Sequence, residues 1–164
     1  MHNITLYGFW RSSCAHRARI ALALKGVDYP ARSIHLGRRE QLQNDFLAIN
    51  PAGQLPVLDI DGERLTQSVA ILRALERRWP TPRLFPKDAT KGDRVEEIVE
   101  RINSFIQPFQ MPGSVRRALL AHQGLEDDAG VVRFVTTHLR DALGLLDEKV
   151  RASAGAFCVG DEVT

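Results

Sequence analysis

A short polar run between two apolar segments holds the side chains best suited to chemistry. Ser12, Ser13 and Cys14 follow a strand-like stretch and precede a segment with helical spacing. A cysteine in the first turn of a helix, with Arg17 nearby, could itself ionise and act as a nucleophile. A packed thiol, or simple helix capping by either serine, is the alternative. His16 is two residues from Cys14 and points to another side of the helix, so no Cys–His pair is predicted.

A second polar pair, Gln67 and Ser68, stands between a predicted strand and a predicted helix. Backbone N–H groups at a helix N-terminus attract anions, so Ser68 and the next amides favour an anion site. Simple capping by Ser68 is the alternative. The first 40 positions hold seven lysines and arginines against Asp28 and Glu40. This bias favours a small anionic ligand, unless the charge only solvates the surface.

Both polar segments must be held in place by the elements around them. Residues 4–10 are strand-like, and the apolar spacing from Ile20 to Leu24 predicts a helix that Gly26 ends. A second strand is predicted at 31–36 and a second helix at 39–47. This order predicts a βαβ unit with a right-handed crossover.

A hairpin is predicted next, because Asp61 and Gly62 between two strand-like runs are the strongest short-range signal for a tight turn. The strands are expected at 57–60 and 63–66. Ser68 then caps a helix that ends before Pro80. Together these elements predict a mixed four-stranded sheet with helices on its faces.

A proline-rich segment marks a domain boundary, because its three prolines fix φ and lack a backbone donor. Beyond it, apolar residues spaced by three and four predict a helix over 95–109, capped by Asp88 or Thr90, and another over 131–150. The predicted organisation is a first domain at 1–79, a linker at 80–87 and an all-α domain at 88–164.

The end of the chain suggests a missing part of the second domain. Thr164 is a good helix-capping residue with no helix after it. Two amphipathic helices with nothing further to cover them make a poor all-α domain. We therefore expect the second domain to be incomplete.

Composition argues against several classes of protein. A net charge of +2 is too small to indicate nucleic-acid binding, and aromatic residues do not alternate with basic ones. Cys14 and Cys158 are far apart and lack zinc-ligand or CxxC spacing, so we expect reduced thiols, no metal and a cytoplasmic protein. No apolar run approaches the roughly 20 residues of a membrane helix, which predicts a soluble chain.

The block from Arg11 to Leu22, RSSCAHRARIAL, resembles the active-site signature of the zeta-class glutathione transferases, the family that includes maleylacetoacetate isomerase. Further matches follow in order: Asn50–Pro51, Gln54–Pro56, Ile60–Gly62, Gln67–Ser68, Pro80–Leu84, Ile106–Pro108 and Cys158–Thr164. The matching positions are closely spaced up to about Gln110 and sparse beyond it. It implies an α/β thioredoxin-like N-terminal domain, an all-α C-terminal domain and glutathione as cofactor.

The chain departs from this family pattern at several positions. Family members usually have Trp where His16 stands, and Met111, Pro112 and Gly113 replace a more usual Asn-Leu continuation. Residues 114–130 match poorly. We therefore expect the substrate side of the site to differ more than the glutathione side.

The resemblance assigns catalysis to Ser12, Ser13 and Cys14, with Ser12 as the donor to the glutathione thiolate and Cys14 in support. Lowering a thiol pKa from about 8.5 by about two units needs nearly 3 kcal/mol. A hydroxyl donating to a thiolate supplies roughly 1.5–3 kcal/mol and a helix N-terminus about 0.3–1. The two effects together are sufficient.

The resemblance also implies how glutathione is held. Pro56 corresponds to a cis proline that exposes the backbone of Leu55, beside Gln54, to the cysteinyl backbone of glutathione; from the sequence alone a trans bond at an edge-strand start is the default. Gln67 and Ser68 would hold the γ-glutamyl carboxylate. The remaining implied glutathione-binding residues are Gln41, on the predicted second helix, and Gln107, in the second domain.

The implied function is cis–trans isomerisation of maleylacetoacetate to fumarylacetoacetate in tyrosine catabolism, with glutathione as an unconsumed cofactor. This dianionic substrate suits Arg11, Arg17 and Arg19, although Arg17 and Arg19 could be structural or face solvent. Conjugation or dehalogenation of other small electrophiles stays open, as does a binding protein that keeps the fold without the chemistry. The resemblance further implies a homodimer.

Overall fold

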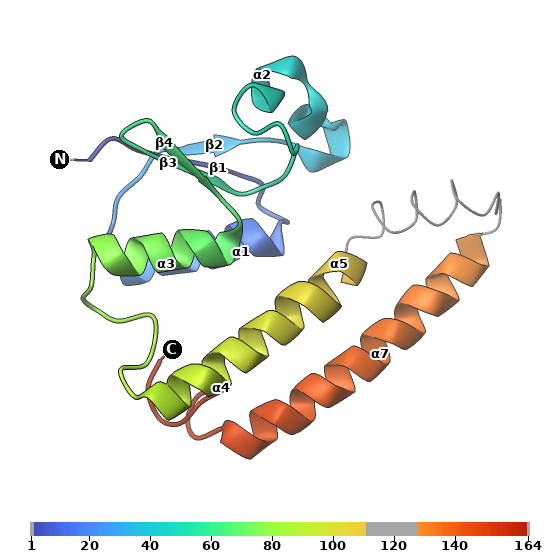
Figure 1. Ribbon diagram of the computed structural model, residues 1–164. Coiled ribbons are helices and arrows are strands. Elements are labelled where there is room, and N and C mark those ends of the chain that lie inside the picture. The colour runs from blue at the N-terminus through green and yellow to red at the C-terminus, as the bar shows by residue number, and fades with distance from the viewer. Residues whose placement is uncertain (1, 111–127, 164) are drawn as a thin grey trace. The chain divides into compact units, whose positions relative to one another are not determined.

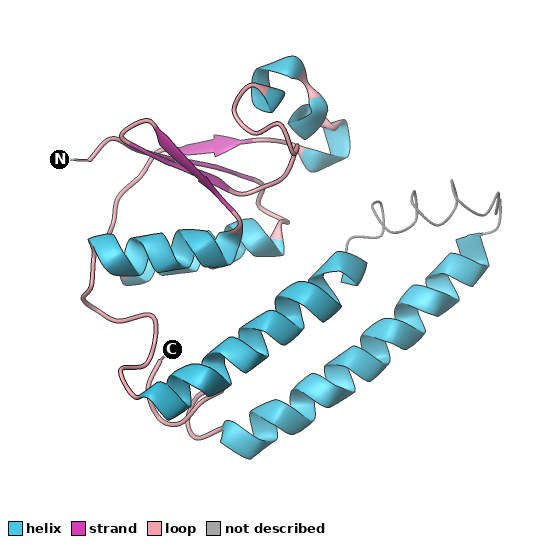
Figure 2. Cartoon of the chain, viewed as in Figure 1, coloured by secondary structure: helices cyan, strands magenta, loops and turns pink. Residues whose placement is uncertain are grey.

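The computed structural model describes residues 2–110 and 128–163 and divides into two compact units, Met1–Leu84 and Phe85–Thr164 (Figure 1). The first unit combines a four-stranded sheet with helices, and the described part of the second is helical (Figure 2). The predicted fold, a thioredoxin-like α/β domain followed by a helical one, is confirmed.

The first unit has the predicted βαβ and ββα parts. Its elements are β1 (Ile4–Gly8), α1 (Ser13–Leu24), β2 (Ala31–Ser33), the 3₁₀ turns η1 (Leu36–Arg38) and η2 (Glu40–Leu42), α2 (Asn44–Leu47), β3 (Val57–Ile60), β4 (Glu63–Thr66) and α3 (Ser68–Arg78). The sheet order is β2-β1-β3-β4, with β1 parallel to β2 and antiparallel to β3. Helices α1 and α3 lie side by side along the sheet (Figure 1).

Small side chains let α1 pack closely against the central strand. Ala15, Ala18 and Ala21 are buried on α1, and a Cβ added at Gly8 of β1 would lie 3.2 Å from the Cβ of Ala15. Any larger residue at Gly8 or Ala15 would push the helix away from the sheet. This contact therefore holds the first turn of α1 close to β1.

Two predictions for residues 31–47 are wrong. The strand expected at 31–36 is only Ala31–Ser33, and the helix expected at 39–47 is replaced by η1, η2 and the short α2. Arg39 has a φ of 58°, in the left-handed region, and separates η1 from η2. Gln43 is extended, with a ψ of 150°, and separates η2 from α2, so no continuous helix forms over 39–47. His35 bends the segment further, because its Nδ1 accepts a hydrogen bond from the N–H of Arg38 over 3.2 Å.

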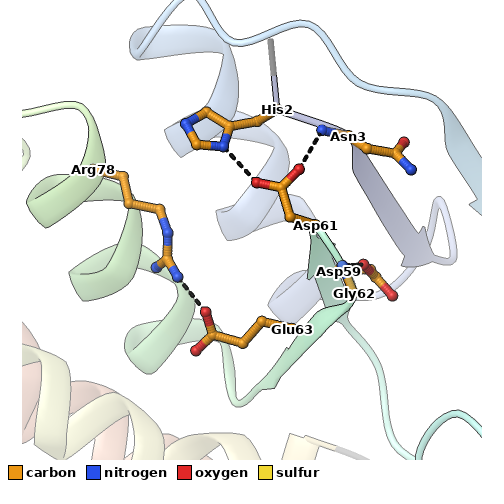
Figure 3. A network of polar contacts seen from close by, with 7 residues as sticks. All are labelled: His2, Asn3, Asp59, Asp61, Gly62, Glu63 and Arg78. Carbon is orange, nitrogen blue, oxygen red and sulfur yellow. Dashed lines mark hydrogen bonds and ion pairs between the residues drawn. The ribbon is translucent and has the colours of Figure 1, made fainter.

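The predicted hairpin is confirmed, with φ of 55° at Asp61 and 88° at Gly62. Nδ1 of His2 lies 2.6 Å from Oδ2 of Asp61, and the backbone N–H of Asn3 donates to Oδ1 over 2.8 Å (Figure 3). These two hydrogen bonds lower the pKa of Asp61. The network ties the hairpin turn to the start of β1, at the opposite end of that strand from Ser12.

A buried ion pair joins the end of α1 to α3. Nζ of Lys25 lies 2.6 Å from Oε2 of Glu76, and Lys25 also donates to the carbonyl of Pro82. The same carboxylate oxygen accepts the N–H of Leu84 over 2.9 Å. Burial raises the pKa of Glu76, but the hydrogen bonds from Lys25 and Leu84 outweigh it and lower the pKa below its ordinary value.

The second unit pairs a long interrupted helix with another long helix (Figure 1). Its elements are α4 (Ala89–Glu100), the π-helix η3 (Arg101–Ile106), α5 (Gln107–Gln110) and α7 (Asp128–Ser153). Oδ1 of Asp88 accepts the N–H of Lys91 over 2.8 Å, which confirms Asp88 as the cap. The predicted helix at 95–109 thus contains a π turn, and the carbonyl oxygen of Phe105 in that turn lies 3.0 Å from Nε2 of His138 on α7.

The helix predicted at 131–150 lies within the longer α7. The departures at Met111, Pro112 and Gly113, and those over 114–127, lie outside the described residues. Within the described part of the chain, no helix has both the length and the apolar character needed to cross a membrane.

Candidate active site

The sheet brings three of the predicted site segments to one end. The strand register pairs Tyr7 with Val57, and Val57 with Thr66. The segments that follow β1 and β4 therefore begin at the same end as the segment that precedes β3. These segments carry the predicted site residues Ser12–Cys14, Gln54–Pro56 and Gln67–Ser68.

Ser12 is the N-cap of α1, and its Oγ accepts a hydrogen bond from the N–H of Ala15 over 3.2 Å. The predicted strand at 4–10 stops at Gly8, because the carbonyl of Phe9 turns to accept the N–H of Ser12 over 3.0 Å. A hydroxyl has one donor and two acceptor positions, so capping leaves the Ser12 proton available for a ligand. Capping and thiolate stabilisation, which the sequence presents as alternatives, are thus compatible.

Ser13 and Cys14 occupy the first turn of α1, and both are half-buried. Nη2 of Arg17 donates to Sγ of Cys14 over 3.5 Å. Arg17 therefore lies beside the first turn, as the sequence predicted. His16 faces elsewhere, and its Nδ1 is 3.1 Å from Nη2 of Arg19.

The peptide bond between Leu55 and Pro56 is cis, as the resemblance implies. Pro56 is buried, whereas Gln54 is exposed. Asn50 holds the preceding turn: its Nδ2 donates to the carbonyl of Gln54 over 2.8 Å, and its Oδ1 accepts the N–H of Ala52 over 3.1 Å. In the sequence, Asn50 stood out only as part of a family match, although an Asn side chain that bonds the backbone two residues on is a common turn-forming feature.

Gln67, and not Ser68, occupies the N-cap position of α3, which corrects the predicted cap. Gln67 has a φ of 65°, and its Nε2 donates to Oε1 of Gln54 over 3.2 Å. Ser68 is the first helical residue and is buried. The first turn of α3 thus begins beside Gln54, where its N–H groups can meet an anion.

Gln41 lies on η2, because the predicted helix is absent. Its Oε1 is buried and has no hydrogen-bond partner among the described residues. A Cβ added at Gly53, which has a φ of 60°, would lie 3.0 Å from the carbonyl oxygen of Gln41, so η2 packs directly beside the turn that leads to Gln54. Gln107 is half-buried on α5 and belongs to the second unit.

The three predicted substrate-binding arginines have different surroundings. Arg11 is exposed, with its guanidinium carbon 5.7 Å from the centroid of the Trp10 ring. Arg17 faces Cys14. Arg19 instead donates to the carbonyls of Phe9 and Trp10.

Comparisons with known proteins identify the family of this chain. Residues 2–77 match the family model "Glutathione S-transferase, N-terminal domain". The maleylacetoacetate isomerase of Mus musculus is 40% identical over 161 residues, which are 97% of this chain and 71% of that protein.

Solved structures show the same likeness. A maleyl pyruvate isomerase, described as a bacterial zeta-class glutathione S-transferase, has a TM-score of 0.87 and 34% identity over 98% of this chain and 76% of its own. A maleylacetoacetate isomerase from Anaeromyxobacter dehalogenans 2CP-1, with glutathione bound in its active site, has a TM-score of 0.83 and 38% identity over 99% of this chain and 75% of its own. This chain, with its Ser-Ser-Cys run at the start of α1, belongs to the zeta-class glutathione transferase family.

Proposed function

We propose that this protein is a glutathione-dependent isomerase that converts the cis double bond of maleylacetoacetate to the trans form. The carrying observation is the position of the Ser12 hydroxyl, at the N-terminus of α1 and at the sheet end that also holds the cis Leu55–Pro56 bond and the start of α3. The names of the mouse and Anaeromyxobacter relatives support the substrate.

The chain's own residues fit glutathione. The buried Oε1 of Gln41 lacks a partner among the described residues, and rotation of the amide offers an N–H instead, so Gln41 suits a peptide N–H or a carboxylate. Gln67 and the first N–H groups of α3 suit the γ-glutamyl carboxylate. The backbone of Leu55 suits the cysteinyl backbone. Gln107, which is half-buried on α5, is proposed as a glutathione-binding residue from the family resemblance alone.

When bound, glutathione supplies a thiolate that adds reversibly to the cis double bond and so permits rotation. Ser12 donates its proton toward the sulfur position, and the N-terminal dipole of α1 adds to the stabilisation of negative charge there. Ser13 and Cys14 line the same turn, and Cys14 orients the ligand. Arg11 and Arg17 attract the carboxylates of the substrate. We also propose a cytoplasmic homodimer, which the family resemblance supports.

A second substrate, maleylpyruvate, is favoured by the structural likeness to maleyl pyruvate isomerase. Maleylpyruvate and maleylacetoacetate share the cis double bond conjugated to a carbonyl and the terminal carboxylate. The same thiolate site serves either molecule, so the distinction lies in the pocket for the rest of the substrate.

The test is turnover of each maleyl substrate with and without glutathione, followed by loss of the cis compound and appearance of the trans product. We expect isomerisation only with glutathione, and no net consumption of glutathione. Turnover of haloacids or conjugation of electrophiles, with the maleyl compounds unchanged, would instead identify a conjugating or dehalogenating transferase. Glutathione binding without any turnover would identify a non-catalytic binding protein.

A further inference from the structure

The side chain of Arg19 is hydrogen-bonded to the loop between β1 and α1, which leads to Ser12. Its Nη1 donates to the carbonyl of Phe9 over 3.3 Å, and its Nη2 donates to the carbonyl of Trp10 over 3.2 Å. The same Nη2 lies 3.1 Å from Nδ1 of His16. A guanidinium only donates, so Nδ1 of His16 is the acceptor and the ring proton of a neutral His16 lies on Nε2.

Phe9, in the loop that Arg19 contacts, is buried, and the centroid of its ring lies 4.7 Å from that of His35. Phe9 follows the last residue of β1, where pairing with the sheet ends, and Trp10 is 73% exposed. The carbonyl of Phe9 accepts both from Arg19 and from the N–H of Ser12. Arg19 therefore acts on the very carbonyl that sets the backbone of Ser12.

We infer that Arg19 is a positioning residue for Ser12 and does not contact the substrate, an inference that rests on the proposed function. The planar fork of the guanidinium spans two successive carbonyls, which the single ammonium of a lysine cannot do. Arg19 comes from α1 itself, so it locks the loop to the same helix whose N-terminus faces the sulfur. His16 adds to the arrangement, because its Nδ1 accepts a second N–H from the same Nη2.

The experiment compares the unmodified protein with Arg19→Lys, His16→Ala and the control Arg32→Lys. Arg32 lies exposed on β2 and matches the change of Arg to Lys without touching the loop. The readouts are the ultraviolet thiolate signal of added glutathione against pH, the Kd for glutathione, the KM for the maleyl substrate and the thermal melting temperature. Arg19→Lys keeps the positive charge, so electrostatic attraction of the substrate is retained.

We expect Arg19→Lys to raise the pH midpoint of the thiolate signal by about one unit, because the hydroxyl of Ser12 is no longer held in line to donate to the sulfur. His16→Ala alters one exposed acceptor, leaves the fold intact and should move the midpoint a smaller distance in the same direction. Arg32→Lys should not move it. The KM for the maleyl substrate should stay within about threefold of the unmodified value.

Unchanged midpoints in Arg19→Lys and His16→Ala would overturn the inference, whether the melting temperature falls or not. A raised substrate KM with an unchanged midpoint would make Arg19 a substrate-binding residue instead. No thiolate signal in the unmodified protein contradicts the proposed function and the inference together, whereas a normal signal there with unchanged variants contradicts the inference alone.

Discussion

The Oγ of Ser12 lies 3.2 Å from the backbone nitrogen of Ala15 and accepts its hydrogen. This bond fixes one lone pair of the hydroxyl toward the helix and leaves the proton to point away from it. The cap thus orients the donor that the proposed chemistry needs. In the proposed mechanism, the same atom caps α1 and activates the sulfur of glutathione.

Replacement of Cys14 by alanine should leave the enzyme active. Arg17 lies 3.5 Å from Sγ, but the thiol in our account only helps to orient the ligand. We expect the turnover number to fall less than about tenfold, the change that about 1.4 kcal/mol makes in a rate. Steady-state kinetics at saturating glutathione checks this. Complete loss of turnover, with the thiolate signal of glutathione intact, would make Cys14 the nucleophile and contradict our assignment.

Replacement of Gln67 by alanine should weaken glutathione binding. Gln67 lies at the start of α3, where the γ-glutamyl carboxylate is proposed to bind, and its side chain donates a hydrogen bond to Gln54. A hydrogen bond to a charged group contributes about 1.5–3 kcal/mol, so the Kd should rise about tenfold or more, with the turnover number at saturation little changed. Calorimetric titration measures the Kd. Gln43→Ala is the matched control, because the side chain of Gln43 makes no capping bond on α2. This variant should bind glutathione with an unchanged Kd.

The sequence predicted local features well, because their causes are local. Asp61 and Gly62 form the expected turn through their own backbone preferences, and Asp88 and Ser12 cap helices with their own side chains. The cis bond before Pro56 came from family resemblance alone, since trans is the intrinsic default.

Features that depend on distant contacts escaped prediction. The helix expected at 39–47 gives way to turns, because Arg39 adopts a left-handed φ and Gln43 an extended ψ of 150°. The sequence left Arg19 with either a substrate-binding or a structural role, and it did not reveal that the side chain reaches back ten residues to the carbonyl of Phe9. Such pairings follow from the packing of α1 on the sheet, which sequence spacing does not encode.

The ion pair of Lys25 and Glu76 should be a main stabilising contact of the first unit. The side chain of Lys25 is 0% exposed and that of Glu76 is 15% exposed. Lys25→Met removes the buried cation from the Glu76 carboxylate and leaves it the N–H of Leu84 and the more distant Arg83, whose Nε lies 4.0 Å from Oε1. The variant should therefore lower the free energy of unfolding by about 3 kcal/mol. Urea unfolding measures it. The double variant Lys25→Met/Glu76→Leu should recover much of the loss, and a single variant as stable as the original would contradict this role.

The same ion pair should make the free energy of unfolding depend on pH. Because the folded-state pKa of Glu76 lies below its unfolded value of about 4.5, its contribution is present above that pH. The contribution is lost as pH falls through the folded-state pKa. Unfolding free energy measured from pH 7 to pH 3 should therefore drop more steeply in the unmodified protein than in Glu76→Gln. Parallel profiles would show that Glu76 is not coupled to folding.

The most direct test of the account is an ultraviolet difference titration of glutathione into the unmodified protein and into Ser12→Gly. Glycine keeps most of the N-cap stability of Ser12, so the variant removes the hydroxyl while preserving the helix. We predict a thiolate signal at pH 7 in the unmodified protein and, in the variant, a midpoint raised by about one to two pH units, with glutathione still bound. A variant whose bound sulfur ionises at the same pH as in the unmodified protein would contradict the central role of Ser12.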